Sequence, residues 1–265
     1  AYYNLGRIFK RLGNLERAIV SYKKAIEINA YFAKAYNNLG NALIVRGTSE
    51  TEAITNYNKA MELKPDYAEA YWNRHGLTED ISYAINTLSR LMIADPSHTK
   101  GLITIAALKK IMGSATEFQA LSYTKFSDHA YKRSFDWFFK LKETPKVYFD
   151  RWSFFNGMTD LADKSRPFYE YGVWMGVSFE YLIKVFGKGF GFDTFSGLPE
   201  DWHNEKAGTY TSKGLIPKIE GGEFIVGKFE DTLPTFFAEK RPKASIINFD
   251  ADLYSSTICA LTNSR

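Results

Sequence analysis

The stretches YYNLGRIFKRLG (Tyr2–Gly13) and YNNLGNALIVRG (Tyr36–Gly47) decide the fold of the N-terminal part of this chain, because they repeat one pattern. Leucine and glycine recur at the same places in both, at an offset of 34 residues (36 − 2). AIVSYKKAIEINA from Ala18 and AITNYNKAMELKP from Ala53 extend the match at an offset of 35 (53 − 18). A period of this length predicts stacked helical hairpins, in which small residues let paired helices approach closely.

A third and weaker copy follows, with Tyr71, Gly76, Ala84 and Pro96 at the expected places. The pattern resembles the tetratricopeptide repeat, and the resemblance implies a repeat domain over residues 1–112. It also implies a concave groove that binds a protein or peptide partner. A spacer or a dimerisation arm is the alternative, because the groove-facing asparagines Asn37, Asn38 and Asn73 are also ordinary residues for a helix surface.

The stretch after the repeats, residues 113–150, has no such period and is expected to be a helical linker. RSFDWFFKLKE, from Arg133, places aromatic and basic residues at roughly helical spacing, and Pro145 ends this pattern. A helix that packs on the neighbouring domains explains the spacing better than a helix on a membrane surface.

Composition limits the classes of protein to which the chain can belong. Its 265 residues are 45% hydrophobic with a formal net charge of +4, which is typical of a globular protein and favours neither a nucleic-acid nor a membrane partner. The one cysteine, Cys259, cannot form an intramolecular disulfide. No signal peptide or membrane-spanning run is visible, so we expect a cytoplasmic location.

The pattern changes to short strands and helices from Pro167 onward. PFYEYGVWMGVSFEYLIKVFGKGFGFDTF indicates a strand, a glycine turn, a helix and a second strand. EFIVGKF from Glu223, a helix opening at Asp231 or Thr232, and ASIINFD from Ala244 continue the alternation. We therefore predict a partial Rossmann-like, doubly wound α/β sheet over residues 151–265, after the helical repeats.

Glycines and acids gather where the predicted strands end, which is where such sheets bind ligands. Gly172 and Gly176 permit close backbone approach, and Asp193 lies 21 residues after Gly172 (193 − 172), where an acid can accept hydrogen bonds from ribose hydroxyls. The spacing G-x-x-x-G is not the dinucleotide fingerprint G-x-G-x-x-G. A nucleotide-binding oxidoreductase is therefore a weaker interpretation than a site for a cofactor without phosphates.

The runs EYGVWMG, GFDTFSGLPEDW, GKFEDTLP and FDADLYSST together resemble class I S-adenosylmethionine-dependent methyltransferases, in the branch of macrocin O-methyltransferase, a macrolide-sugar O-methyltransferase. The resemblance implies methyl transfer from S-adenosyl-L-methionine to a hydroxyl of a small sugar-like or polyol substrate. It assigns the methionine part of the cofactor to Glu170, Gly172 and Gly176, the ribose to Asp193, and the adenine pocket to Phe229 and Glu230.

Two aspartates in the FDADLY run carry the predicted chemistry. The resemblance implies that Asp250 is a ligand of Mg²⁺ and that Asp252 acts beside it in catalysis, although Asp252 is also a candidate helix N-cap. Relatives often have lysine where this chain has Leu253, so the general base is sought elsewhere. His203 is the histidine of the C-terminal half and our candidate, with a surface histidine of no catalytic role as the alternative.

The family fold has strands beyond the fourth, so we expect Arg265 to be a truncation point and this fragment to be inactive. The full-length protein is then the expected enzyme. The alternative function is an interaction protein whose repeats bind partners and whose methyltransferase-like domain is catalytically inactive.

Overall fold

The computed structural model describes residues 1–47, 49–143, 145–203 and 205–264. The chain divides into two compact units, Ala1–Phe154 and Phe155–Arg265, and each unit is described by itself. The division falls within helix α10 (Arg151–Leu161), at whose first residue the sequence places the start of the second domain.

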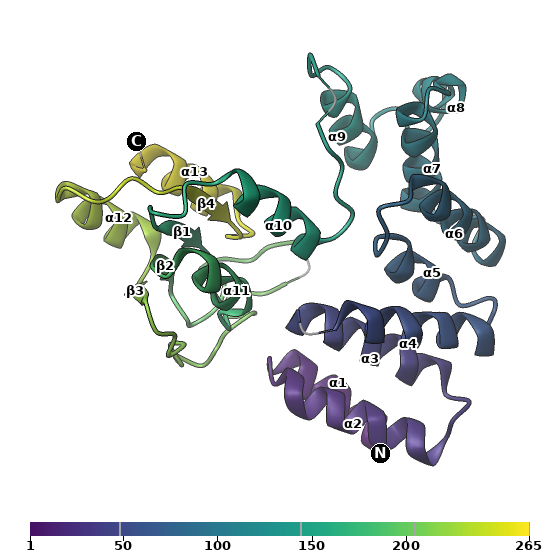
Figure 1. Ribbon diagram of the computed structural model, residues 1–265, viewed down its shortest axis with the longest axis horizontal. Coiled ribbons are helices and arrows are strands. Elements are labelled where there is room, and N and C mark those ends of the chain that lie inside the picture. Colours follow the sequence, from purple (N-terminus) through teal and green to yellow (C-terminus); the bar gives the residue numbers. More distant parts are fainter. Residues whose placement is uncertain (48, 144, 204, 265) are drawn as a thin grey trace. The chain divides into compact units, whose positions relative to one another are not determined.

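The first unit is built of antiparallel helical hairpins, seen from purple to teal in Figure 1. The first three hairpins are the predicted repeats. The next helix, Thr99–Ile111, still lies in the expected repeat domain, and the helices after it lie in the expected linker. The helices are α1 (Tyr2–Arg11), α2 (Leu15–Ile28), α3 (Ala33–Arg46), α4 (Glu50–Leu63), α5 (Ala68–His75), α6 (Ile81–Ala94), α7 (Thr99–Ile111), α8 (Thr116–Ala120), the 3-10 turn η1 (Leu121–Tyr123) and α9 (Ala130–Phe138).

Glycine and tyrosine lock each of the first two hairpins. Gly6 of α1 faces the ring of Tyr22, and Gly40 of α3 faces Tyr57 in the same way, so that a methyl group on either glycine would lie within 3 Å of the ring. Both tyrosine rings are buried in the core of the unit. The period of 34 residues therefore reflects a glycine–tyrosine contact between paired helices that recurs in each of the two hairpins.

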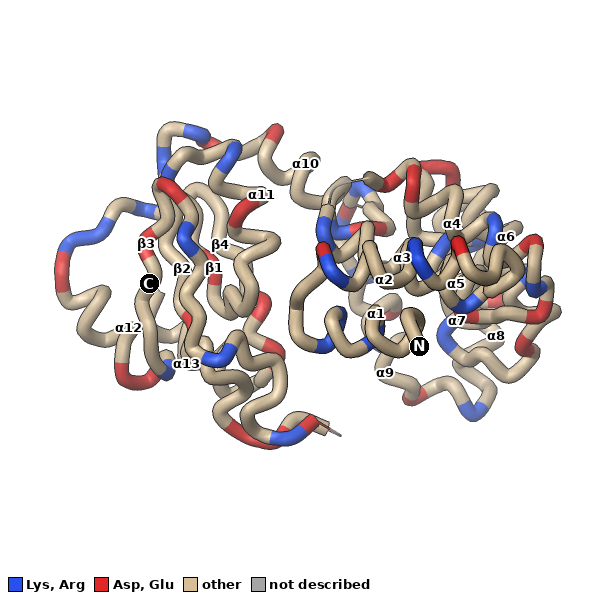
Figure 2. Tube along the Cα trace, turned by 90° about the horizontal axis from the view of Figure 1, so that it is seen from below, with Lys and Arg blue, Asp and Glu red and all other residues tan. Residues whose placement is uncertain are grey.

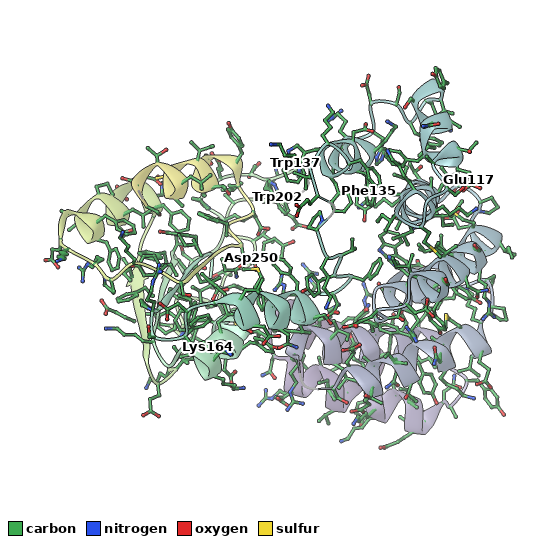
Figure 3. The ribbon with its side chains drawn as sticks, turned by 45° about the horizontal axis from the view of Figure 1, so that its top comes forward. Glu117, Phe135, Trp137, Lys164, Trp202 and Asp250 are labelled. Atoms are coloured by element: carbon green, nitrogen blue, oxygen red, sulfur yellow. The ribbon has the colours of Figure 1, made fainter. Side chains whose placement is uncertain are left out.

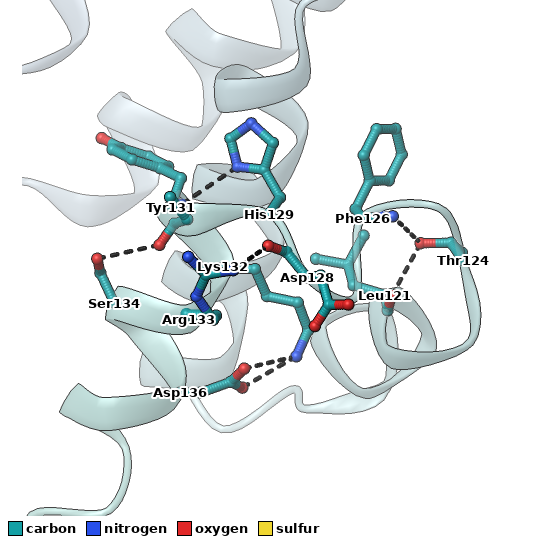
Figure 4. Close-up of polar contacts among 11 residues, drawn as sticks. Leu121, Thr124, Phe126, Asp128, His129, Tyr131, Lys132, Arg133, Ser134 and Asp136 are labelled. Atoms are coloured by element: carbon teal, nitrogen blue, oxygen red, sulfur yellow. Dashed lines mark hydrogen bonds and ion pairs between the residues drawn. The ribbon is translucent and has the colours of Figure 1, made fainter. Parts of the chain in front are cut away.

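The last helices of the first unit pack through an aromatic cluster with a buried cation. Phe118 of α8 lies edge-on to Phe139, which follows α9, at 5.0 Å between ring centroids. Lys132 is 4% exposed, donates to both carboxylate oxygens of Asp136, and lies over the Phe118 ring (Figure 4). His129 caps α9 by accepting from the backbone N–H of Tyr131. Arg133 and Trp137 thus belong to a packed helix.

The second unit is a four-stranded parallel sheet with helices, as the sequence predicts. The strands are β1 (Phe168–Tyr171), β2 (Gly189–Asp193), β3 (Gly222–Val226) and β4 (Ile246–Phe249), in the order β3-β2-β1-β4. Phe168 pairs with Gly189 on one side and with Ile246 on the other. The helices after α10 are α11 (Val177–Phe186), α12 (Phe229–Ala238) and α13 (Tyr254–Asn263).

Order β3-β2-β1-β4 makes the sheet doubly wound, because the chain adds β2 and β3 on one side of β1 and then crosses to place β4 on the other. The switch point between β1 and β4 is where such sheets hold ligands. One difference from the expected boundaries affects the site: β3 ends at Val226, and α12 begins at Phe229 rather than at Asp231 or Thr232. Phe229 and Glu230 therefore belong to the first turn of a helix.

Basic and acidic residues are interspersed along both units (Figure 2). Among the described residues, every helix is too short or too polar to cross a lipid bilayer.

Replacing Gly40 by alanine tests the glycine–tyrosine contact. The new Cβ would lie 2.8 Å from a ring carbon of Tyr57, so we expect Gly40→Ala to lower the free energy of unfolding by about 1–3 kcal/mol in urea denaturation. Glu27→Ala introduces the same residue at an exposed site of α2 and should change it by about 0.5 kcal/mol at most. Equal effects of the two substitutions would contradict the contact's role.

Candidate functional site

A cleft opens at the carboxyl ends of the strands in the second unit. Its empty volume is about 570 Å³, which includes open solvent. It brings together six of the nine predicted site residues. They are Gly172, Asp193, Phe229, Glu230, Asp250 and Asp252.

Gly172 follows β1 and lets the backbone after β4 come close. Its φ is +89°, and a Cβ at this position would lie 2.2 Å from the carbonyl oxygen of Asp250. Only glycine fits both conditions. Gly176, at φ +76°, is the N-cap of helix α11, and a Cβ there would meet Pro217 and Ile219, so it shapes the turn without lining the cleft.

Asp193, at the end of β2, holds the turn after β1 in place. Its Oδ2 accepts hydrogen bonds from the backbone N–H groups of Val173 and Trp174, both at 2.7 Å. Its Oδ1 accepts from the N–H of Phe195 at 2.6 Å. Asp193 thus organises two loops at the end of its strand, and its predicted contact with a ribose stays a prediction.

Glu170 lies inside the sheet and not on the cleft surface. Its side chain is fully buried, and Oε1 accepts hydrogen bonds from Ser178 of α11 at 2.5 Å and from the side chain of Asn248 of β4 at 2.7 Å. It therefore ties a helix and a neighbouring strand to β1. Its predicted contact with the methionine part of a cofactor stays a prediction.

Phe229 and Glu230 reach the cleft from the start of α12. Phe229 is 8% exposed and packs edge-on against Tyr171, at 5.6 Å between ring centroids, so one ring edge belongs to the core while the residue borders the cleft. The carboxylate of Glu230 lies 3.8 Å from the ammonium of Lys228. Their predicted contact with an adenine ring stays a prediction.

Asp250 and Asp252 follow β4 and both line the cleft; Asp250 is labelled in Figure 3. The N–H of Asp250 donates to the carbonyl of Tyr171, which continues the β1–β4 pairing. The N-cap of α13 is Leu253, so the alternative role of Asp252 as that cap is wrong. Asp252 has a φ of +56°, a left-handed conformation that aspartate tolerates better than most residues.

Two carboxylates, those of Asp250 and Asp252, support the metal prediction, but the described residues offer no larger set of ligands. Within the described parts of the chain, no three His, Cys, Asp or Glu side chains are grouped so as to hold a metal ion. A hard cation such as Mg²⁺ needs about six oxygens, of which waters and substrate can supply several. Asp250 as a magnesium ligand therefore stays a prediction.

His203 lies on an exposed loop outside the cleft. Its ring contacts the neighbouring Trp202 at 5.3 Å between centroids, and His203 is not among the cleft-lining residues. Its predicted role as general base therefore has no support from position in this conformation. Asp252, which does line the cleft, is better placed to accept a proton.

Sequence reasoning missed two aromatic residues of the cleft, Trp174 and Tyr210. Their rings meet edge-on at 6.3 Å, and both have φ angles in the left-handed region, +50° and +60°, where bulky residues are strained. Burial, then the charges of Glu205 and Asp252, raises the pKa of the Tyr210 hydroxyl. That hydroxyl is therefore protonated and able to donate at neutral pH.

The charge of the cleft favours a cationic or zwitterionic ligand. Four carboxylates line it, and among the described lining residues only Lys228 carries a positive charge. Free phosphate groups would be repelled at such a surface, whereas a sulfonium or ammonium group would be attracted. The carboxylates are Asp193, Glu230, Asp250 and Asp252.

In the first unit, the asparagines expected at the groove make contacts between successive hairpins. The Asn38 amide donates to the Tyr3 hydroxyl at 2.9 Å, and the Asn73 amide donates to Asn37 Oδ1 at 2.9 Å. Asn37 is 3% exposed and is therefore not a surface residue. A separate polar cavity on this unit is lined in part by Lys34 and His98.

Comparison with known proteins identifies the repeats. The TPR repeat family matches residues 6–44 and 51–77, so the first hairpins are tetratricopeptide repeats. No curated protein sequence matches the chain.

Solved structures with similarity include the first TPR of Spaghetti (RPAP3) bound to HSP90 peptide SRMEEVD, at 18% identity over 43% of this chain and 91% of that chain, with a TM-score of 0.39. MamA is 18% identical over 52% of this chain and 86% of its own, with a TM-score of 0.42. The Thermobaculum terrenum O-GlcNAc transferase mutant K341M is 12% identical over 98% of this chain and 42% of its own, with a TM-score of 0.37.

Alanine at Gly172 should damage the second unit more than alanine at a glycine of similar φ. Gly208 has a φ of +85°, and a Cβ added there would have nothing within 4 Å, so Gly208→Ala reports the cost of backbone strain alone. We expect Gly172→Ala to lower the free energy of unfolding by about 1–3 kcal/mol more than Gly208→Ala, because of the contact with Asp250. Equal losses in urea denaturation would show that the close approach carries no energetic weight.

Proposed function

We propose that this chain joins a protein-binding repeat domain to an S-adenosylmethionine-dependent O-methyltransferase site. The two parts have different support. The TPR family match and the observed hairpins support protein interaction by the repeats. Methyl transfer rests on the cleft of the second unit, and the comparisons with known proteins favour the interaction role over it.

A polar groove on the first unit supports binding of a peptide with charged groups of both signs. The cavity between successive hairpins is lined by Lys34 and Lys64 on one hand and by Asp66, Glu69 and Asp95 on the other. Such a surface can pair with both acidic and basic groups of a peptide and can form hydrogen bonds with its amides.

Selection of binding peptides from a random library, with the whole protein as the target, tests the groove. We expect peptides that bind the wild type to lose at least about tenfold in affinity with Lys34→Glu, because reversal of a rim charge introduces repulsion. Lys23→Glu changes an exposed lysine outside the cavity and serves as the control. Peptides that bind both variants like the wild type would exclude this groove.

The meeting of six predicted residues in one cleft is the observation that carries the methyltransferase proposal. In it, Asp193 accepts hydrogen bonds from ribose hydroxyls, Phe229 and Glu230 border the adenine, and Gly172 gives the backbone access to the methionine part. When bound, S-adenosylmethionine supplies the methyl group as a sulfonium electrophile.

The acceptor side of the cleft is formed by Asp250, Asp252 and Tyr210. The carboxylate of Asp252 accepts the proton of the acceptor hydroxyl, and the protonated Tyr210 donates to a neighbouring oxygen of the acceptor. Fixing the hydroxyl beside these groups replaces a bimolecular encounter by a positioned reaction. A sugar-like or polyol acceptor offers the several hydroxyls that this set of donors and acceptors can bind.

Calorimetric titration with S-adenosylhomocysteine tests this proposal. The whole protein should bind it, and Asp193→Ala should weaken binding by about tenfold or more, because hydrogen bonds to a charged group are lost. Asp250→Ala should leave cofactor affinity within about twofold, but should remove any increase in affinity caused by Mg²⁺.

Asp201→Ala is the matched control, since this carboxylate is exposed on the same unit and pairs with Lys206 outside the cleft. The Asp201→Ala variant should bind S-adenosylhomocysteine with the affinity of the wild type. Absence of binding by the wild type would overturn the enzyme proposal and favour the interaction protein with an inactive second domain.

A further inference from the structure

The carboxylate of Asp193 already has most of its hydrogen-bonding capacity in use. A carboxylate accepts at about four lone-pair positions. Three are taken by the N–H groups of Val173, Trp174 and Phe195, at 2.6–2.7 Å. One position is left, on Oδ1.

A ribose presents two adjacent hydroxyls, each of which can donate one hydrogen bond to a carboxylate oxygen. Two hydroxyls and three amides exceed the capacity of Asp193. A ligand that donates both of its hydroxyls to Asp193 therefore displaces one of the three backbone amides.

Trp174 is the residue whose amide is released most easily. Phe195 is 1% exposed and packs edge-on against Phe224, and Val173 is 3% exposed, so both are fixed by their surroundings. Trp174, in contrast, is half-buried and borders the cleft, while its φ of +50° is as strained as the +56° of Phe195. Its indole Nε1 is buried and has no hydrogen-bond partner among the residues that the structure describes.

Strain and an unsatisfied N–H in one residue destabilise the observed turn conformation. The two hydrogen bonds from main-chain N–H groups to Oδ2 of Asp193 offset that cost. The turn is thus held by the same carboxylate that a ribose would engage. Loss of one amide contact would let Trp174 leave the left-handed region and find a partner for its indole.

We propose that Asp193 is the trigger of a conformational change in the Gly172–Gly176 turn: a ligand with two adjacent hydroxyls takes the place of the Trp174 amide, and the turn rearranges. This inference rests on the proposed function, which assigns Asp193 to a nucleoside cofactor. It goes further by giving Trp174 the part of a positioning residue that responds to the cofactor.

The rearrangement would reach the acceptor side through an aromatic contact. The Trp174 ring lies edge-on against Tyr210, and the negative charge of Asp252 acts on the Tyr210 hydroxyl. A moving Trp174 therefore shifts the wall beside the acceptor carboxylates. The cofactor then binds before the acceptor, because its ribose shapes the acceptor part of the cleft.

Tryptophan fluorescence of the whole protein tests the trigger. The probes are S-adenosylhomocysteine, adenosine and 2′,3′-dideoxyadenosine, which lacks both hydroxyls, each at saturating concentration. We expect S-adenosylhomocysteine and adenosine to change the emission of the wild type and of the Trp202→Phe variant. The emission of the Trp174→Phe variant should stay unchanged. Dideoxyadenosine should bind at least about tenfold more weakly and give no Trp174-dependent change.

A change with saturating dideoxyadenosine equal to that with adenosine would overturn the trigger, as would binding of S-adenosylhomocysteine without any change that depends on Trp174. Hydrogen exchange of the wild type gives a second reading that needs no variant. Peptides covering residues 172–176 should exchange faster with adenosine than with dideoxyadenosine, and equal rates would count against the trigger. If calorimetry detects no binding of S-adenosylhomocysteine, the proposed function itself has failed.

Discussion

The second unit depends on one carboxylate, that of Asp193, which binds three backbone N–H groups from two different loops. These contacts fix the turn after β1 and the start of the loop after β2, and together they border the cleft. They also hold Trp174 and Phe195 in left-handed conformations that side chains of this size seldom adopt. Such strain is typical of functional sites, where surrounding structure maintains what local preference disfavours.

Much of the architecture follows from sequence periodicity. The offset of 34 residues predicts the hairpins because glycine and tyrosine meet at one place in each, and the strand–turn–helix alternation predicts the parallel sheet. The candidate site was partly predictable for a related reason: parallel strands end at one edge of the sheet. Residues that end or follow strands, such as Gly172, Asp193 and Asp250, therefore gather there.

The features that could not be predicted from the sequence lie in loops and in local backbone conformation. Tyr210 comes from a long loop without periodicity, and nothing in its neighbours indicates that it meets Trp174. The left-handed conformation of Asp252 moves the cap of α13 to Leu253, and the early start of α12 brings Phe229 into a helix. These features result from long-range contacts that override local preference.

The central claim, a nucleoside cofactor bound at the strand ends, is tested most directly by a crystal structure of the whole protein with S-adenosylhomocysteine. The account predicts ribose hydroxyls within hydrogen-bond distance of the Asp193 carboxylate and adenine beside Phe229. A ligand bound elsewhere, or bound in this cleft with no contact to Asp193, would contradict it.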